Sequence, residues 1–126
     1  MTKNNTPIPT EINLHKKSRI LEISFESGER FELSCEFLRV YSPSAEVRGH
    51  GPGQEVLQFG KADVEITQIE AIGTYAIKLY FDDGHDTGLY SWEWLYYLGS
   101  HQEKLWQEYL EKLERAGKKR TPTAIN

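Results

Sequence analysis

The spacing of apolar residues along this chain changes once, from every second residue to every third or fourth. Leu21, Ile23 and Phe25 alternate with polar residues, which is the pattern of a strand with one buried face. Later the spacing becomes helical, and one apolar stripe is made of Leu105, Trp106, Tyr109, Leu110 and Leu113. Strands followed by helices predict an α+β domain, with a small, mostly antiparallel sheet, a short helix after the first hairpin, and one or two C-terminal helices packed on the sheet.

The first two strands of this sheet form a hairpin, because residues 26–29 between them have turn chemistry. Asp-Gly at 83–84 is a second strong turn signal, and Gly73-Thr74 is a third. Strands are predicted at residues 19–25, 31–33, 64–72, 75–81 and 87–90, with an edge strand at 11–14.

Helices are expected at three places. A short one fits residues 35–41, since Pro43 disfavours helix in the residue before it. Ser91 is a suitable N-cap for a second, which Gly99 would end because glycine accepts the left-handed conformation after a helix. Ser100 and Glu103 would form a capping box for the third. Residues 42–61, rich in glycine and proline, are predicted to be the least regular part.

The length of 126 residues allows one hydrophobic core. We expect a single domain at residues 11–116, a disordered lead-in at 1–10 and a disordered basic tail at 117–126, since both ends are polar and contain proline or glycine. One cysteine cannot form an internal disulfide, and residues 1–10 lack the features of a signal peptide, so a cytoplasmic location is expected. No membrane span is apparent, and a net charge of −4 without a concentrated basic surface argues against nucleic-acid binding.

Catalytic and metal-binding motifs are absent from the sequence, so we expect neither an enzyme nor a cofactor. No histidine lies at ligand spacing from another donor, and Cys35 has no partner base and is expected to be a buried thiol. The alternative is a small metal- or ligand-binding protein that uses His85, His50 and nearby aspartates such as Asp83. The aspartates of that turn are also explained by hydrogen bonds to their own backbone.

Aromatic residues crowd the segment 90–97, at Tyr90, Trp92, Trp94, Tyr96 and Tyr97. One short helix cannot bury all five in the same core, so at least one or two must lie at the surface or in a groove. Tryptophan and tyrosine are enriched at protein-binding hot spots, although they also pack small cores. A protein partner is therefore the leading hypothesis, and a homodimer through exposed aromatic side chains is another.

Two runs of residues carry a resemblance to a known family: L-R-x-x-S-P-S-A-E at 38–46 and D-G-H-x-x-G-x-Y-S-W at 83–92. Residues 11–98 resemble the gamma-butyrobetaine hydroxylase-like N-terminal domain in its stand-alone bacterial form, long catalogued as a domain of unknown function. In the hydroxylases this domain precedes an iron- and 2-oxoglutarate-binding catalytic domain, and the resemblance implies a chain without that catalytic part.

In the same hydroxylases the small domain holds a structural zinc through three cysteines and a histidine. The resemblance places these ligands at Ser42, Ser44, Val47 and His85, so three of the four are missing and it implies no such zinc site. The domain also resembles an appendage fused to iron–sulfur P-loop ATPases, which implies an accessory or docking role. For the metal- or ligand-binding alternative, the resemblance implies a link to iron–sulfur or iron-dependent enzymes. The expected binding residues are Arg39, Ser42, Ser44, Glu46, His50, Asp83, His85, Tyr90 and Trp92.

Overall fold

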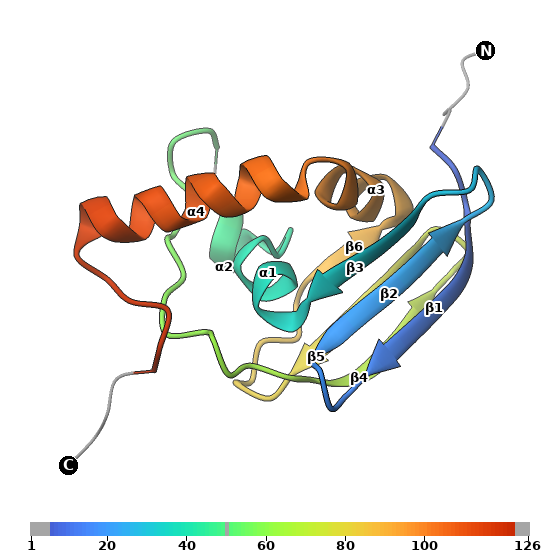
Figure 1. The fold of residues 1–126 in the computed structure, drawn as a ribbon, viewed down its shortest axis with the longest axis horizontal. Coiled ribbons are helices and arrows are strands. Elements are labelled where there is room, and N and C mark those ends of the chain that lie inside the picture. The colour runs from blue at the N-terminus through green and yellow to red at the C-terminus, as the bar shows by residue number, and fades with distance from the viewer. Residues whose placement is uncertain (1–5, 50, 123–126) are drawn as a thin grey trace.

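The computed structural model describes residues 6–49 and 51–122, which fold into two three-stranded antiparallel sheets and four helices (Figure 1). The predicted α+β class is confirmed. The strands, however, are divided between two sheets, with the orders β1-β2-β3 and β4-β5-β6, rather than joined in one. The elements are β1 (Pro9–His15), β2 (Ile20–Phe25), β3 (Arg30–Ser34), α1 (Cys35–Val40), α2 (Ala45–Arg48), β4 (Ile66–Ile72), β5 (Ala76–Phe81), β6 (Leu89–Ser91), α3 (Trp92–Ser100) and α4 (Gln102–Ala116).

The central strand of the first sheet has the alternation that the sequence predicts. In β2, Leu21 and Ile23 are fully buried and Phe25 is nearly so, while the residues between them are half-buried. Ile23 lies opposite Phe31 of β3 and Ile12 of β1. The edge strand β1 begins at Pro9, so residues 9 and 10 belong to the sheet and not to the predicted lead-in, whose residues 1–5 lie outside the described part.

One core joins both sheets to α1 and α3. It contains Ile23 of the first sheet, Leu79 of the second, Phe37 of α1, and Leu95 and Leu98 of α3. Figure 1 shows α3 and α4 together on one side of the sheets, with α1 beneath α4. No helix in the described part of the chain is both long enough and apolar enough to cross a bilayer.

Helix α1 is buried on every side, including the charged residues Glu36 and Arg39. The hydroxyl of Ser34 caps it by accepting a hydrogen bond from the Phe37 N–H at 3.0 Å. A buried charge is tolerated only when it is paired, so each of these two residues needs a partner from a distant segment. The partner of Arg39 is Asp83, which belongs to the candidate site. The partner of Glu36 is Arg120, which holds the C-terminal residues against the domain.

The boundary between the last two helices differs from the prediction. Helix α3 starts, as expected, with the Ser91 hydroxyl accepting from the Trp94 N–H at 3.0 Å, but it continues through Gly99 to Ser100. A side chain at Gly99 would come within 2.3 Å of the Phe31 ring, so glycine serves close packing on β3 and not helix termination. The predicted capping box is also wrong, since α4 begins after His101 without a side-chain cap.

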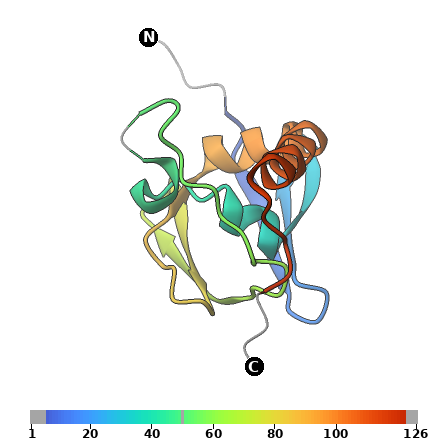
Figure 2. The same cartoon turned by 90° about the vertical axis from the view of Figure 1, so that its left-hand side faces the viewer.

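Helix α4 buries Leu105, Tyr109 and Leu113, and it leaves Trp106 and Leu110 of the predicted stripe half-buried. The irregular stretch 42–61 holds one short helix, α2, capped by Ser44. Figure 2 shows the later part of that stretch, on the way to β4, passing between α2 and α4.

Residues 117–122 are held against the domain and do not form the disordered tail that composition predicted; residues 123–126 lie outside the described part. Gly60 and Ala62 donate backbone hydrogen bonds, each of 2.9 Å, to the carbonyls of Lys119 and Arg120. The Arg120 guanidinium donates two more to the buried Glu36 carboxylate, at 2.7 and 2.9 Å. Glu36 needs a cation because folding buries its carboxylate, and the composition of the C-terminal residues does not reveal this need.

Replacing Arg120 with glutamine is expected to lower the free energy of unfolding by about 1–3 kcal/mol, because the Glu36 carboxylate then stays buried without its charged partner. Urea denaturation at neutral pH measures this difference. Lys119→Gln is the matched control, since it keeps the backbone contacts and the neighbouring ion pair. Equal losses in the two variants would show that the Arg120–Glu36 pair does not stabilise the fold.

Candidate functional site

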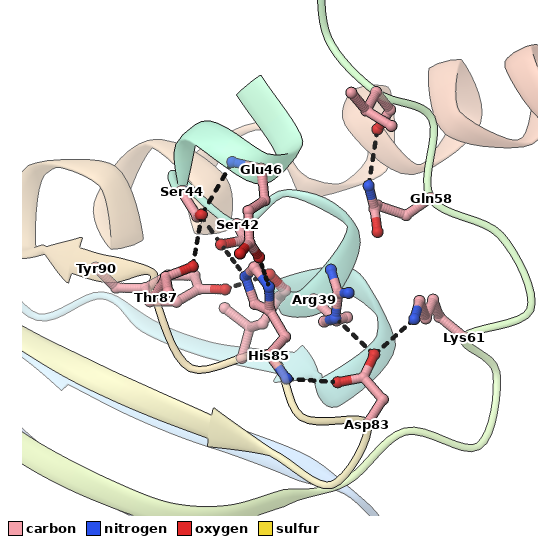
Figure 3. A network of polar contacts seen from close by, with 12 residues as sticks. Arg39, Ser42, Ser44, Glu46, Gln58, Lys61, Asp83, His85, Thr87 and Tyr90 are labelled. Atoms are coloured by element: carbon pink, nitrogen blue, oxygen red, sulfur yellow. Dashed lines mark hydrogen bonds and ion pairs between the residues drawn. The ribbon is translucent and has the colours of Figure 1, made fainter. Parts of the chain in front are cut away.

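The two sequence motifs meet around the buried side chain of His85, which lies in the turn between β5 and β6 (Figure 3). Its Nε2 lies 2.8 Å from the Ser42 hydroxyl, just after α1. Its Nδ1 lies 3.0 Å from a carboxylate oxygen of Glu46 in α2. We refer to Ser42, His85 and Glu46 as the serine–histidine–glutamate cluster.

The hydrogen bonds of the cluster assign one tautomer to His85. A carboxylate only accepts, so Nδ1 carries the proton and donates to Glu46, and Nε2 accepts from the Ser42 hydroxyl. Burial and then the nearby Arg39 cation lower the pKa of His85, although Glu46 opposes them. The imidazole is therefore neutral near pH 7, and it links three segments of the chain.

The order serine, histidine, carboxylate is also that of a hydrolytic triad, so access to the serine decides what the cluster does. Ser42 is 0% exposed. Gly88 lies directly against it, since a methyl group at Gly88 would stand 2.5 Å from the Ser42 hydroxyl oxygen and 3.2 Å from the Tyr90 ring. The Ser42 hydroxyl is thus covered in this structure, and its contact with His85 links the end of α1 to the histidine turn.

Asp83, two residues before His85, forms the second half of the site. Its carboxylate accepts from Arg39 Nε at 2.8 Å, from Lys61 Nζ at 2.6 Å and from the His85 N–H at 3.2 Å. Burial alone would raise the pKa of Asp83, but the hydrogen bonds from Lys61 and Arg39 hold it at about 2. Asp83 therefore stays ionised, and it neutralises the buried arginine of α1.

Seven of the nine expected binding residues converge here. Tyr90 is fully buried and donates to the Leu38 carbonyl at 2.6 Å, and Ser44 shares a 2.7 Å hydrogen bond with Thr87. Trp92 does not join the cluster, because its indole N–H donates to the Thr74 carbonyl in the β4–β5 turn. His50 lies outside the described residues.

Sequence reasoning missed two members of the site, Lys61 and Thr87. Thr87 lies inside the second motif, so its position was a signal that could have been used. Lys61 comes from an irregular segment 22 residues before Asp83, and no local pattern identifies it as a partner.

The zinc ligand set of the hydroxylases does not fit the same positions in this chain. Ser42 and Ser44 offer hydroxyl groups that are already hydrogen-bonded, and Val47 has no donor atom. His85 alone supplies a zinc-type ligand, whereas a structural zinc site needs four. Across residues 6–49 and 51–122, no group of three or more His, Cys, Asp or Glu side chains could hold a metal ion. Cys35 is buried as expected, and burial raises its pKa.

A stack of side chains, which we call the aromatic ladder, lies at the surface next to α2. Trp94 and Tyr97 are stacked with their ring centroids 5.4 Å apart, and His101 lies 4.5 Å beyond Tyr97. The Arg48 guanidinium of α2 lies over the Trp94 ring, 4.9 Å from its centroid. Tyr97 is 41% exposed and nearby Leu89 is 46% exposed. The prediction that one or two of the five crowded aromatic residues reach the surface is thus confirmed.

Protonation of His85 is expected to destabilise the fold. Because the pKa of His85 is lowered in the folded state from 6.5, the unfolded state takes up the proton first. This contribution to stability is present above about pH 6.5 and is lost as the pH falls below it. An NMR titration of the histidine ring signals, with His85→Gln to assign them, should give a His85 midpoint below 6.5; a midpoint at or above that value would contradict the assignment.

Fold and site together define a small two-sheet α+β domain, in which hydrogen bonds and ion pairs fix the histidine turn to the first two helices. A family model described as gamma-butyrobetaine hydroxylase-like, N-terminal, matches residues 12–96, more than half of the chain. The chain belongs to this family. No curated protein matches it.

Solved structures agree with this assignment. Two NMR solution structures share 47% and 53% sequence identity with this chain, with TM-scores of 0.83 and 0.82. The first match covers 96% of this chain and 95% of the other, and the second covers 100% and 96%. A crystal structure of a protein of unknown function from Acidithiobacillus ferrooxidans ATCC 23270, of the DUF971 family, is 32% identical over 77% of this chain and 98% of its own, with a TM-score of 0.64.

Proposed function

We propose that this domain is a non-enzymatic accessory domain that binds another protein through the aromatic ladder and Leu89. The observation that carries the proposal is the stack of a half-buried tryptophan with an exposed tyrosine and an exposed arginine, the three residue types most enriched at binding hot spots. The expected partner surface is an apolar segment of a different protein, because Tyr97 and Leu89 present apolar area to solvent.

The buried cluster supports this role by holding the ladder in place before a partner arrives. Arg48 belongs to α2, whose cap Ser44 is bonded to Thr87 and whose Glu46 is bonded to His85. Trp94 is fixed separately, since its indole N–H donates to the Tyr41 carbonyl at 2.9 Å. A surface that is ordered in advance loses less side-chain entropy on binding.

An affinity experiment on cell extract tests the proposal. The intact domain, Tyr97→Ala and the control Tyr75→Ala serve as baits, and quantitative mass spectrometry compares the proteins retained. Tyr75 is 58% exposed in the turn between β4 and β5, and its ring is not part of the stack of Trp94, Tyr97 and His101. A partner should be lost with Tyr97→Ala and kept with Tyr75→Ala, and the binding should be reproduced with the purified partner. Retention that is equal for both variants would contradict the proposal.

Self-association is the competing outcome for the same surface. Light scattering on the purified domain separates the two, since a homodimer through the ladder doubles the mass and dissociates in Tyr97→Ala. No catalysis, cofactor or nucleic acid is part of the proposed role. The metal-binding alternative receives no support from the described residues, because Asp83 is occupied by two cations and Asp82 accepts from the Glu65 N–H.

A further inference from the structure

A small cleft opens between α2, α4 and the segment 55–58, with a volume of about 260 Å³. Its floor is apolar and buried, formed by Val40, Val47 and Tyr109. Figure 2 shows the segment before β4 passing between α2 and α4, which places it along the cleft. The serine–histidine–glutamate cluster is not among the residues that line the cleft.

Hydrogen bonds hold the walls of this cleft in position. The Val56 N–H donates to the Val47 carbonyl at 2.8 Å, which fixes the segment to α2. The Tyr109 hydroxyl donates to the Gln58 carbonyl at 2.9 Å, which fixes it to α4. The cleft is therefore formed without a ligand, as most small-molecule sites are.

The rim carries two basic side chains, Arg48 and Lys112, and one acidic side chain, Glu55. Within the described ranges, no carboxylate lies within ion-pair distance of either Arg48 or Lys112, and this includes Glu108, one turn before Lys112. Glu55, in contrast, already accepts a hydrogen bond from the Gly53 N–H at 3.1 Å. Two cations that have no carboxylate partner, of which Arg48 also lies over the Trp94 ring, are thus next to a buried apolar floor.

We infer that this cleft binds a small carboxylic acid with an apolar tail, a role beyond protein binding that shares only Arg48 with the aromatic ladder. The carboxylate would pair with Arg48 and Lys112, and the tail would lie on Val40, Val47 and Tyr109. The cleft is slightly smaller than the range of about 300–1,000 Å³ typical of ligand pockets, so the acid is short. An amine is disfavoured by the two cations, and an inorganic anion leaves the apolar floor uncovered.

An NMR titration with hexanoate tests this inference, with hexanol and hexylamine as probes of the same tail. Hexanoate should shift the methyl signals of Val40, Val47 and Val56 in a saturable way, and the other two probes should bind more weakly. No saturable shift, shifts elsewhere on the domain, or equal binding of hexanol would each overturn the inference.

Lys112→Gln tests the charge directly and leaves the aromatic ladder intact. Removing one partly exposed ion pair should weaken hexanoate binding about 2- to 5-fold. Lys104→Gln, an exposed lysine of the same helix that does not line the cleft, is the control and should bind as the unchanged domain does. Unchanged affinity in Lys112→Gln would overturn carboxylate recognition, whereas the protein-binding proposal is tested separately by Tyr97→Ala.

Discussion

Replacing Leu98 with alanine is expected to lower the free energy of unfolding by about 2–5 kcal/mol, because the truncation leaves a cavity in the core. Leu98 is fully buried and belongs to the cluster that joins both sheets to α3. A single domain of this size has a total stability of about 5–15 kcal/mol, so this loss is a large fraction of it. Urea denaturation followed by circular dichroism measures the change.

Tyr97→Ala, one residue earlier in the same helix, is the control for this variant. Tyr97 is 41% exposed, and its removal is expected to cost less than about 1 kcal/mol. Similar losses at the two positions would mean that α3 does not bury the face that the structure assigns to it. If Tyr97→Ala is folded, the variant is also a valid bait in the affinity experiment. Loss of a partner then results from the changed surface and not from unfolding.

Gly88→Ala is expected to destabilise the domain by about 2–4 kcal/mol through overpacking together with a damaged buried hydrogen bond. The added methyl group would lie 2.5 Å from the Ser42 hydroxyl oxygen, where Tyr90 also leaves no room. Either Ser42 or the Gly88 backbone must move, and the contact between Ser42 and His85 is lost or lengthened. The ring signals of His85 should shift in the same variant.

Gly51→Ala is the matched control, because a side chain there meets nothing within 4 Å. Its expected effect is within about 0.5 kcal/mol, as at most surface positions. If Gly88→Ala were as stable as Gly51→Ala, the Ser42 hydroxyl would be more accessible than the structure shows. A nucleophilic Ser42 would then be compatible with the fold.

Local patterns predicted most of the strands and helices. Alternation in Leu21, Ile23 and Phe25 located β2 because successive side chains of a strand point to opposite faces. Ser91 located the start of α3 because its hydroxyl satisfies an N–H of the first turn. The prediction for Gly99 was wrong because glycine occurs both where a helix ends and where two elements pack closely. The close approach of Gly99 to Phe31 is visible only in three dimensions.

The candidate site was predicted as a set of residues but not as a set of contacts. The two motifs pointed to Ser42, Glu46 and His85, yet Ser42 and His85 are 43 residues apart, and nothing local pairs them. Whether this group is a nucleophile or a structural link depends on burial, which follows from the position of Gly88. Lys61 and Arg120 were missed for the same reason, since each pairs with a carboxylate far away in the sequence.

By itself, the sequence determined the α+β class and most of the element positions, because periodicity, caps and turns act over a few residues. Its two motifs carried the resemblance to the family that the family model confirms. The tertiary structure decided that the strands form two sheets, that residues 117–122 are bound to the domain, and that Ser42 is covered. These three features depend on how segments far apart in the sequence pair and pack. That packing is governed by close contacts and by the cost of burying charged and polar groups, neither of which a local pattern shows.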